Sequence, residues 1–229
     1  MADRRARVQI TGPMVLAAAV LLAACGTGQL PQGGGASGGS GGTASETRSV
    51  SGFTTIQLGG YGDVQIQQTG TESLTVTADP ALLPLVTSEV KDGALQLGLK
   101  DDNAFNDRQR VAYTVTVRNL TGLDIGGSGS MNATGVKTTS LTVRIAGSGS
   151  VTTAGTADAQ SIDMAGSGDY RGLGLATTTS TVRSAGAGTV EVAARDRLDV
   201  TVIGSGNVLY TGSPQVQQSI LGSGTIQKK

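Results

Sequence analysis

The sequence predicts an all-β fold in which most of the folded part is a parallel β-helix, a coil of stacked strands also called a solenoid. Three observations favour this class. The 229 residues contain 36 glycines, no tryptophan and few other aromatic residues. Short segments alternate apolar and polar residues, as half-buried strands do. A triplet of the Gly-Ser-Gly type recurs at a nearly constant period in the second half. Long helices would need fewer glycines and more good helix formers.

Residues 1–24 have the pattern of an export signal. Three arginines within the first seven residues precede the apolar run Val15–Ala24. This run suits a signal-peptide core and is too short to span a bilayer. It leads into Leu-Ala-Ala-Cys-Gly at 22–26, which resembles the lipobox of bacterial lipoproteins. By that resemblance Cys25, the only cysteine, is lipidated and becomes the mature N-terminus. The alternative is an ordinary signal peptide that happens to contain a cysteine.

Residues 25–46 are expected to form a tether between the lipidated Cys25 and a folded domain at 47–227. From Gly26 to Glu46 the chain reads GTGQLPQGGGASGGSGGTASE, with no apolar periodicity. Sequences of this composition behave as flexible coils, and about 20 such residues have a root-mean-square reach of roughly 25 Å. The tether would therefore lift the domain off the membrane.

The first part of the domain, residues 47–120, is predicted to be β-rich and irregular. Apolar residues occupy every second position in five segments, at Thr54–Leu58, Asp63–Gln68, Ser73–Ala78, Ala94–Leu99 and Val111–Val117. Lys91-Asp92-Gly93 suits a hairpin turn. Asp79 and Pro80 could start one short helical turn, which Pro84 would end. The polar segment 101–110 is expected to be an exposed loop, and no helix of ordinary length is expected.

The second part, residues 121–227, is an internal repeat. The glycine triplets begin at Gly127, Gly147, Gly166, Gly186, Gly204 and Gly222, so that 18 to 20 residues separate them. Aligning the copies brings apolar residues into columns. The position two residues before each triplet holds Ile125, Ile145, Met164, Ser184, Val202 and Ile220. The position four residues after the first glycine of each triplet holds Met131, Val151, Tyr170, Val190, Val208 and Ile226. A repeat this short buries these residues only against its neighbours, as stacked rungs do.

Each triplet is interpreted as a corner of a rung, at which the chain turns between two strands. The expected turn residues are Gly127, Gly129, Gly147, Gly149, Gly166, Gly168, Gly186, Gly188, Gly204, Gly206, Gly222 and Gly224. Ser128 and its equivalents are expected to form a ladder of hydroxyl groups between rungs. The alternative is an antiparallel β sandwich or barrel with hairpins at the triplets, because Gly-Ser-Gly can also turn a hairpin.

The repeated IxGSGxV pattern, the segment IGSGNVLYTGSP at 203–214 and the opening VSGFTTIQLGGYGDVQIQQ at 50–68 resemble one bacterial family. This family is the putative auto-transporter adhesin, head GIN domain, and the resemblance covers roughly residues 47–227. It implies a right-handed parallel β-helix and a role in adhesion without catalytic residues.

The composition and motifs argue against several kinds of chemistry. No Lys followed by Ser or Thr comes after a glycine triplet, so a phosphate loop is not expected. The acids do not have the spacing of a calcium repeat. Lys and Arg together equal Asp and Glu, at 17 each, which gives no sign of nucleic-acid binding. The chain has no histidine. We therefore expect no catalytic residues, no cofactor and no metal.

One column of the repeat carries charges of alternating sign. It contains Asp124, Arg144, Asp163, Arg183, Thr201 and Ser219. At stacked positions this order is typical of an exposed ladder of ion pairs, each worth less than about 1 kcal/mol. The interpretation makes these acids structural and not catalytic.

The most consistent function is a noncatalytic binding or adhesion module, exported and anchored by lipid in the cell membrane or outer membrane, facing the surface or the periplasm. Its partners would be the membrane and a carbohydrate or surface protein. The candidate binding surface contains Tyr61, Tyr210, and Asp102 and Arg108 of the polar loop. One alternative is a structural or signalling-accessory envelope lipoprotein. A degenerate carbohydrate-active enzyme is a further alternative.

Overall fold

A computed structural model describes residues 42–100 and 110–229, and the part from Ser40 to Lys229 is one compact unit. The expected tether and Cys25 lie almost wholly outside the described residues. Strands make up nearly all of the described domain. They are β1 (Ala44–Arg48), β2 (Thr55–Gly60), β3 (Asp63–Gln68), β4 (Ser73–Ala78), β5 (Val86–Lys91), β6 (Ala94–Leu99), β7 (Ala112–Val117), β8 (Gly122–Gly127), β9 (Ser130–Gly147), β10 (Ser150–Gly166), β11 (Asp169–Gly186), β12 (Thr189–Gly204), β13 (Asn207–Thr211), β14 (Gln215–Gly222) and β15 (Thr225–Lys228).

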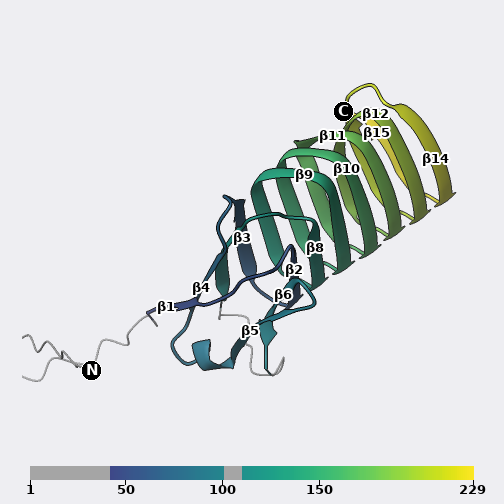
Figure 1. The fold of residues 1–229 in the computed structure, drawn as a ribbon. Helices are drawn as coiled ribbons and strands as arrows, with labels where there is room; N and C mark the ends of the chain where they lie inside the picture. The colour runs from purple at the N-terminus through teal and green to yellow at the C-terminus, as the bar shows by residue number, and fades with distance from the viewer. Residues whose placement is uncertain (1–41, 101–109) are drawn as a thin grey trace, which may run out of the picture. The chain divides into compact units, whose positions relative to one another are not determined.

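The repeat forms a parallel β-solenoid of about five turns, as the sequence predicts (Figure 1). The long strands β9, β10, β11 and β12 pair side by side, all parallel. Their register keeps the corner glycines in one column, with Gly127 opposite Gly147 and Gly147 opposite Gly166. The antiparallel sandwich or barrel alternative is wrong, because consecutive repeats stack in parallel instead of folding back as hairpins.

The core consists of the apolar columns that the repeat alignment brings together. Ile125, Ile145 and Met164 are buried on one side of the corner, and Met131, Val151 and Tyr170 are buried on the other. Each inward residue stacks on its equivalent in the next rung, so burial requires neighbouring rungs. Towards the C-terminus this cover ends, and Ile220 on β14 is 41% exposed.

The solenoid begins well before the glycine repeat does. Strands β2 and β3 run parallel to β8 and β9, with Gly60 opposite Gly127 and Asp63 opposite Ser130. Gly60-Tyr61-Gly62 is therefore a corner equivalent to the Gly-Ser-Gly triplets, with Tyr61 in the place of the serine. Strands β6 and β7 form the next rung outward, because β6 pairs with the other edge of β2 and β7 with the other edge of β3.

Antiparallel strands cover the N-terminal end of the stack. Strand β4 pairs with β7 and β1 with β4, while β5 pairs with β6 through the predicted hairpin. In that hairpin Asp92 and Gly93 both have positive φ, 51° and 75°, as a two-residue hairpin turn with its matching twist requires. The expected turn at Asp79 is present, because the Ala81 N–H donates to the Asp79 carboxylate at 2.8 Å and the Leu82 and Leu83 N–H groups donate to the Asp79 carbonyl at 2.9 Å and 3.0 Å. Pro84 does not end the turn as expected, since the 3₁₀ segment Leu83–Leu85 that follows includes it. Proline fits there because the first residues of a helical turn need no N–H partner.

Backbone groups join the corners from rung to rung. The Ser148 N–H donates to the Gly127 carbonyl at 3.0 Å, and the Ser167 N–H donates to the Gly147 carbonyl at 2.9 Å. Gly147 has a φ of +117°, a conformation that side chains rarely adopt. The predicted hydroxyl ladder is wrong, because no hydrogen bond within the described residues joins two of these serine hydroxyls. The serines point outward at the tip, and the main chain makes the contact.

Candidate functional site

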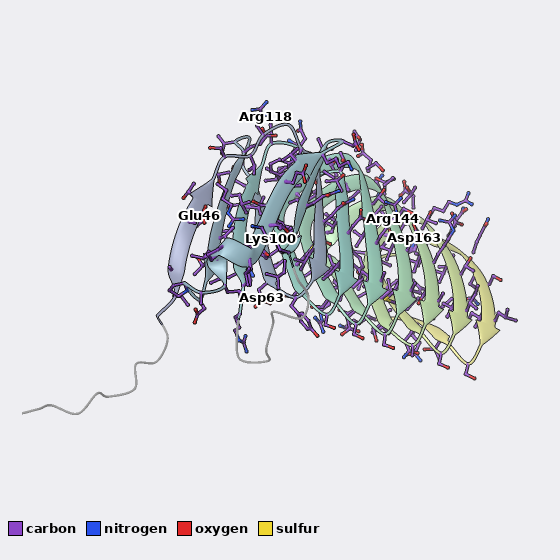
Figure 2. All side chains as sticks on the ribbon, turned by 90° about the horizontal axis from the view of Figure 1, so that it is seen from below. Glu46, Asp63, Lys100, Arg118, Arg144 and Asp163 are labelled. Carbon is purple, nitrogen blue, oxygen red and sulfur yellow. The ribbon has the colours of Figure 1, made fainter. Side chains whose placement is uncertain are left out.

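The charged column lies on the outer surface of the solenoid, as the sequence predicts (Figure 2). Arg144 lies 3.6 Å from the carboxylate of Asp124, and Arg183 lies 3.7 Å from that of Asp163. The side chain of Gln57 extends the column by donating to Asp124 at 3.1 Å. Both arginine side chains are more than 60% exposed, so solvent weakens each pair to less than about 1 kcal/mol. The acids of this column are paired with arginines on neighbouring strands.

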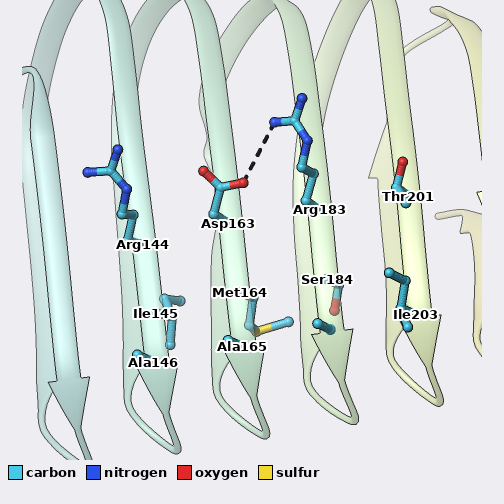
Figure 3. Close-up of a pocket in the computed structure, with 11 residues that line it drawn as sticks. Arg144, Ile145, Ala146, Asp163, Met164, Ala165, Arg183, Ser184, Thr201 and Ile203 are labelled. Atoms are coloured by element: carbon cyan, nitrogen blue, oxygen red, sulfur yellow. Dashed lines mark ion pairs between the residues drawn. The ribbon is translucent and has the colours of Figure 1, made fainter.

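A shallow hollow of about 350 Å³ lies beside the charged column (Figure 3). We call it the alanine hollow, because the exposed residues Ala146, Ala165 and Ala185 form a strip across it, two positions beyond the charges. Ile203 continues the strip and is 51% exposed. The hollow is at the small end of the size range of ligand sites, about 300–1,000 Å³. It offers methyl groups bordered by charges that are already paired.

A larger groove of about 870 Å³ crosses several rungs at another corner. We call it the threonine groove. Its lining comprises residues 137–139 of β9, 156–158 of β10 and 176–178 of β11, together with Thr54, Asn119, Thr121 and Arg195. The pairing of these strands places Thr156 beside both Lys137 and Ala176. Successive strands are about 4.8 Å apart, so each rung contributes its own polar groups to the groove at that spacing.

Several polar groups of the groove are free to bind a ligand. Among residues 42–100 and 110–229, no hydrogen bond or ion pair involves the Lys137 ammonium, the Asp158 carboxylate or the hydroxyls of Thr139 and Thr156. By contrast, Arg195 is held by Asp196, at 2.7 Å and 3.1 Å. This pairing raises the pKa of Arg195 and lowers that of Asp196, mainly through the hydrogen bond between them. The groove thus contains one arginine held in place by an ion pair, together with donors and acceptors that a ligand could bind.

A buried polar cluster lies inside the solenoid behind the groove. The Tyr170 hydroxyl lies 2.7 Å from the Thr153 hydroxyl and donates to the Gln160 amide oxygen at 2.9 Å. The Gln160 amide nitrogen donates to Ser180 at 2.8 Å. Thr177 bonds to Ser180 at 2.8 Å and also lines the groove. Because each member has partners, the cluster holds the floor of the groove in one arrangement.

Burial changes the acidity of two tyrosines. It raises the pKa of Tyr170 to about 12, against a smaller lowering by the hydrogen bond to Thr153. It also raises the pKa of Tyr113 to about 12, with the nearby Arg48 acting in the opposite direction. The Tyr113 hydroxyl has no hydrogen-bond partner within the described residues. Neither group ionises near neutral pH, so both act as structural residues.

Two of the four surface residues expected from the sequence, Tyr61 and Tyr210, lie among the described residues, several rungs apart along the stack. Tyr61 lies at the tip of an early corner and is 47% exposed. Tyr210 is half-buried on β13, where it packs against the core. Asp102 and Arg108 lie outside the described residues. Sequence reasoning missed the threonine groove, although Lys-Thr-Thr at 137–139 and Thr-Thr-Thr at 177–179 were visible signals.

The described residues contain no group of three or more Asp, Glu, His or Cys side chains that could hold a metal ion. In the same part of the chain, no helix has the length and apolar character needed to span a membrane. The threonine groove offers hydrogen-bonding groups, and the alanine hollow offers apolar contact.

Comparisons with known proteins agree with this architecture. The family model for putative auto-transporter adhesin, head GIN domain, matches residues 52–214. The solved structure of a putative adhesin from Bacteroides fragilis is 23% identical, with a TM-score of 0.68 over 83% of this chain and 98% of that one. A putative adhesin from Parabacteroides distasonis is 26% identical, with a TM-score of 0.55 over the same shares. A putative lipid binding protein from the same organism is 24% identical, with a TM-score of 0.50 and the same coverage. No curated protein sequence matches.

Proposed function

Because the chain belongs to the putative auto-transporter adhesin, head GIN domain family, we propose that it is an exported, noncatalytic binding module of the cell envelope, anchored by lipid at Cys25. The family and the putative adhesin that is 26% identical support the adhesion-like role. The N-terminal signal pattern and the lipobox resemblance support export and anchoring. Acyl chains on one residue would hold the module at a membrane, since each buried methylene contributes about 0.8 kcal/mol.

The threonine groove is the proposed contact surface, and one observation carries this choice. Its free hydroxyls, ammonium and carboxylate come from the neighbouring rungs β9 and β10, so the groove presents a different set of polar groups from each rung, one strand spacing apart. A ligand that matches them is extended and carries hydroxyl groups along its length. Polysaccharides of a cell surface or matrix have this chemistry, because each sugar presents several donors and acceptors. The groove is open and shallow enough to accept a chain from the side.

The charged column supports the noncatalytic part of the proposal. Glycoside cleavage commonly uses two carboxyl groups, one acting as an acid and one as a nucleophile or base. Here Asp124 and Asp163 each lie beside an arginine, and Arg144 stands between them in the register. Asp158 stands in the groove without a second carboxylate among the groove-lining residues. These acids fit a structural and binding role.

A binding panel tests the proposal. The purified protein is passed over immobilised chitin, cellulose, xylan, mannan, peptidoglycan and mucin, and the retained fraction is measured. We expect at least one polymer to retain the protein, and Thr156→Trp, which fills the groove, to abolish the retention. Thr114→Trp on β7 is the matched control, since Thr114 is also an exposed strand threonine away from both surfaces.

The same panel distinguishes the two surfaces. Thr201→Trp fills the alanine hollow and leaves the threonine groove intact. If Thr201→Trp abolishes retention and Thr156→Trp does not, the hollow is the binding site and the groove is not. Retention by no polymer would favour the structural or signalling-accessory alternative.

A further inference from the structure

The C-terminal end of the solenoid is an open sheet edge. Strand β14 pairs only with β12, and β15 pairs only with β13, among the strands that the structure describes. Val216, Gln218 and Ile220 continue the inward columns, opposite Leu198, Val200 and Val202. No further rung within the described residues covers them, and Ile220 is 41% exposed. The end therefore presents both unpaired main-chain groups and uncovered core residues.

The two ends of the stack differ in their protection. At the N-terminal end the edge strands are β1 and β5, which are antiparallel to their neighbours and carry Glu46, Arg48, Glu89 and Lys91. Charged edge strands discourage pairing with other chains. Strand β14 reads QVQQSILG and carries no charge. Its neighbour β15 carries Lys228, so the unprotected edge is β14 alone.

The sequence of β14 is symmetric about Gln218 on its inward side. Two antiparallel copies with Gln218 opposite Gln218 would place Val216 of each copy opposite Ile220 of the other. The inward residues then remain inward in both copies, because side chains alternate strictly along a strand. The apolar residues would meet each other, and the two Gln218 amides, each with a donor and an acceptor, would meet at the two-fold axis.

We propose that β14 is a dimer interface, at which a second copy of this chain pairs antiparallel to complete the open end. A head-to-tail contact is disfavoured, since the N-terminal end presents charged antiparallel strands instead of a matching rung. An isologous contact uses the same surface twice and closes after two copies. Two tethered copies would present two threonine grooves, which strengthens binding to a repeating polymer by avidity.

Disulfide trapping tests the register in the full-length chain. The only native cysteine is removed by Cys25→Ser, and Gln218→Cys is then added. We expect a covalent dimer under non-reducing conditions, because the two introduced thiols face each other across the axis. Gln217→Cys is the matched control. In this register residue 217 of one copy lies opposite residue 219 of the other, so the two introduced cysteines are diagonal neighbours, beyond the reach of a disulfide. A mixture of Val216→Cys and Ile220→Cys chains should cross-link to each other. Equal cross-linking at 217 and 218, or none at 218, would overturn the proposed pairing.

Light scattering of the Cys25→Ser chain gives an independent test through its molar mass. We expect a dimer, and we expect Ile220→Lys to weaken the dimer at least tenfold by facing a lysine towards the partner's Val216. Leu221→Lys is the control, because Leu221 is more exposed, at 72%, but lies on the outward side of the strand. Circular dichroism establishes that both variants are folded. A monomeric parent protein at all concentrations, or equal effects of the two lysines, would refute the interface.

Discussion

The hydroxyl of Tyr170 donates a 2.9 Å hydrogen bond to the amide oxygen of Gln160, inside a solenoid whose core is otherwise mostly apolar. The two residues come from adjacent rungs, β11 and β10. Thr153, also on β10, shares the same hydroxyl at 2.7 Å. A buried polar group costs free energy unless its partners are in place, so this contact favours one register between the two rungs over others.

Removing this hydroxyl should destabilise the domain. Tyr170→Phe leaves the buried Gln160 oxygen without its donor, and we expect the free energy of unfolding to fall by about 1–3 kcal/mol. Urea denaturation followed by circular dichroism measures the change. Tyr210→Phe is the matched control, because the Tyr210 hydroxyl bonds to no described residue; we expect a change within about 0.5 kcal/mol. Equal stability of Tyr170→Phe and the parent protein would contradict a structural role for the cluster.

The raised pKa values of Tyr113 and Tyr170, both about 12, predict alkaline instability. In the unfolded chain a tyrosine has a pKa of about 10. Between pH 10 and 12 the unfolded chain releases these protons while the folded protein retains them. The contribution of the two tyrosines to the free energy of unfolding is therefore fully present below about pH 10. It is lost as the pH rises towards 12, at a rate of at most about 3 kcal/mol per pH unit for the two groups together.

Denaturation with urea at a series of alkaline pH values measures this slope. The variant Tyr113→Phe/Tyr170→Phe should lose most of the pH dependence, even though it starts from a lower stability. Lysines also titrate in this range, and they are the same in both proteins, so the difference between the slopes reports the tyrosines. Identical slopes would show that burial of the two hydroxyls does not govern the alkaline behaviour.

The second glycine of each corner triplet should tolerate no side chain. A Cβ at Gly129 would lie 2.5 Å from Leu58 Cδ2 and 2.7 Å from the Gly62 carbonyl oxygen. Because one of these atoms is backbone, Gly129→Val should cost about 1–3 kcal/mol or more, by the usual penalty of overpacking. Ser128→Val is the control, since Ser128 is exposed at the tip of the same corner. Thermal unfolding measures both, and an unchanged midpoint for Gly129→Val would refute the close contact.

The proposed lipid anchor gives a prediction that does not depend on the fold. Cys25→Ser should abolish metabolic labelling with palmitate and release the protein from the membrane fraction of the producing bacterium. Ser45→Ala, on strand β1 at the start of the folded domain, should leave both properties unchanged. Continued labelling of the Cys25→Ser chain would show that the lipid, if any, is attached elsewhere.

Much of the solenoid was readable from the sequence because its repeats keep a regular offset. Aligned triplets brought Ile125, Ile145 and Met164 into one buried column and predicted the exposed column of Asp124, Arg144, Asp163 and Arg183. Parallel stacking turns an equal offset in sequence into direct contact in space.

The early corner at Gly60 was missed for a physical reason. Gly60 pairs with Gly127, but the two are 67 residues apart because β4, β5, β6 and β7 are inserted between them in the chain. Tyr61 also replaces the usual serine at the tip. Side chains at a corner tip point to solvent, so packing does not restrict their type, and the motif is harder to recognise.

The threonine groove was missed because the repeat was aligned forward from each triplet and on its apolar columns, whereas the groove residues keep their offset only when they are counted back from the next triplet. The register between β10 and β11 shifts between Thr152 and Ala154, and the register between β9 and β10 shifts beside Gly155. Such bulges add residues to one strand and displace everything that follows them. Counting forward from the preceding triplet places Asp158 one residue earlier than Thr139 and Thr178, but all three lie eight residues before the next triplet, and the strands bring them to one surface.

The length dependence of carbohydrate binding tests the central claim most directly. Oligosaccharides of increasing length, cut from the polymer that retains the protein, are titrated into it by calorimetry. The threonine groove predicts that the dissociation constant falls with each added sugar until the chain spans the groove, and then stays constant. In Thr156→Trp the gain with length should disappear. An affinity that is the same for one sugar as for a long chain, or that Thr156→Trp leaves unchanged, would contradict binding along the groove.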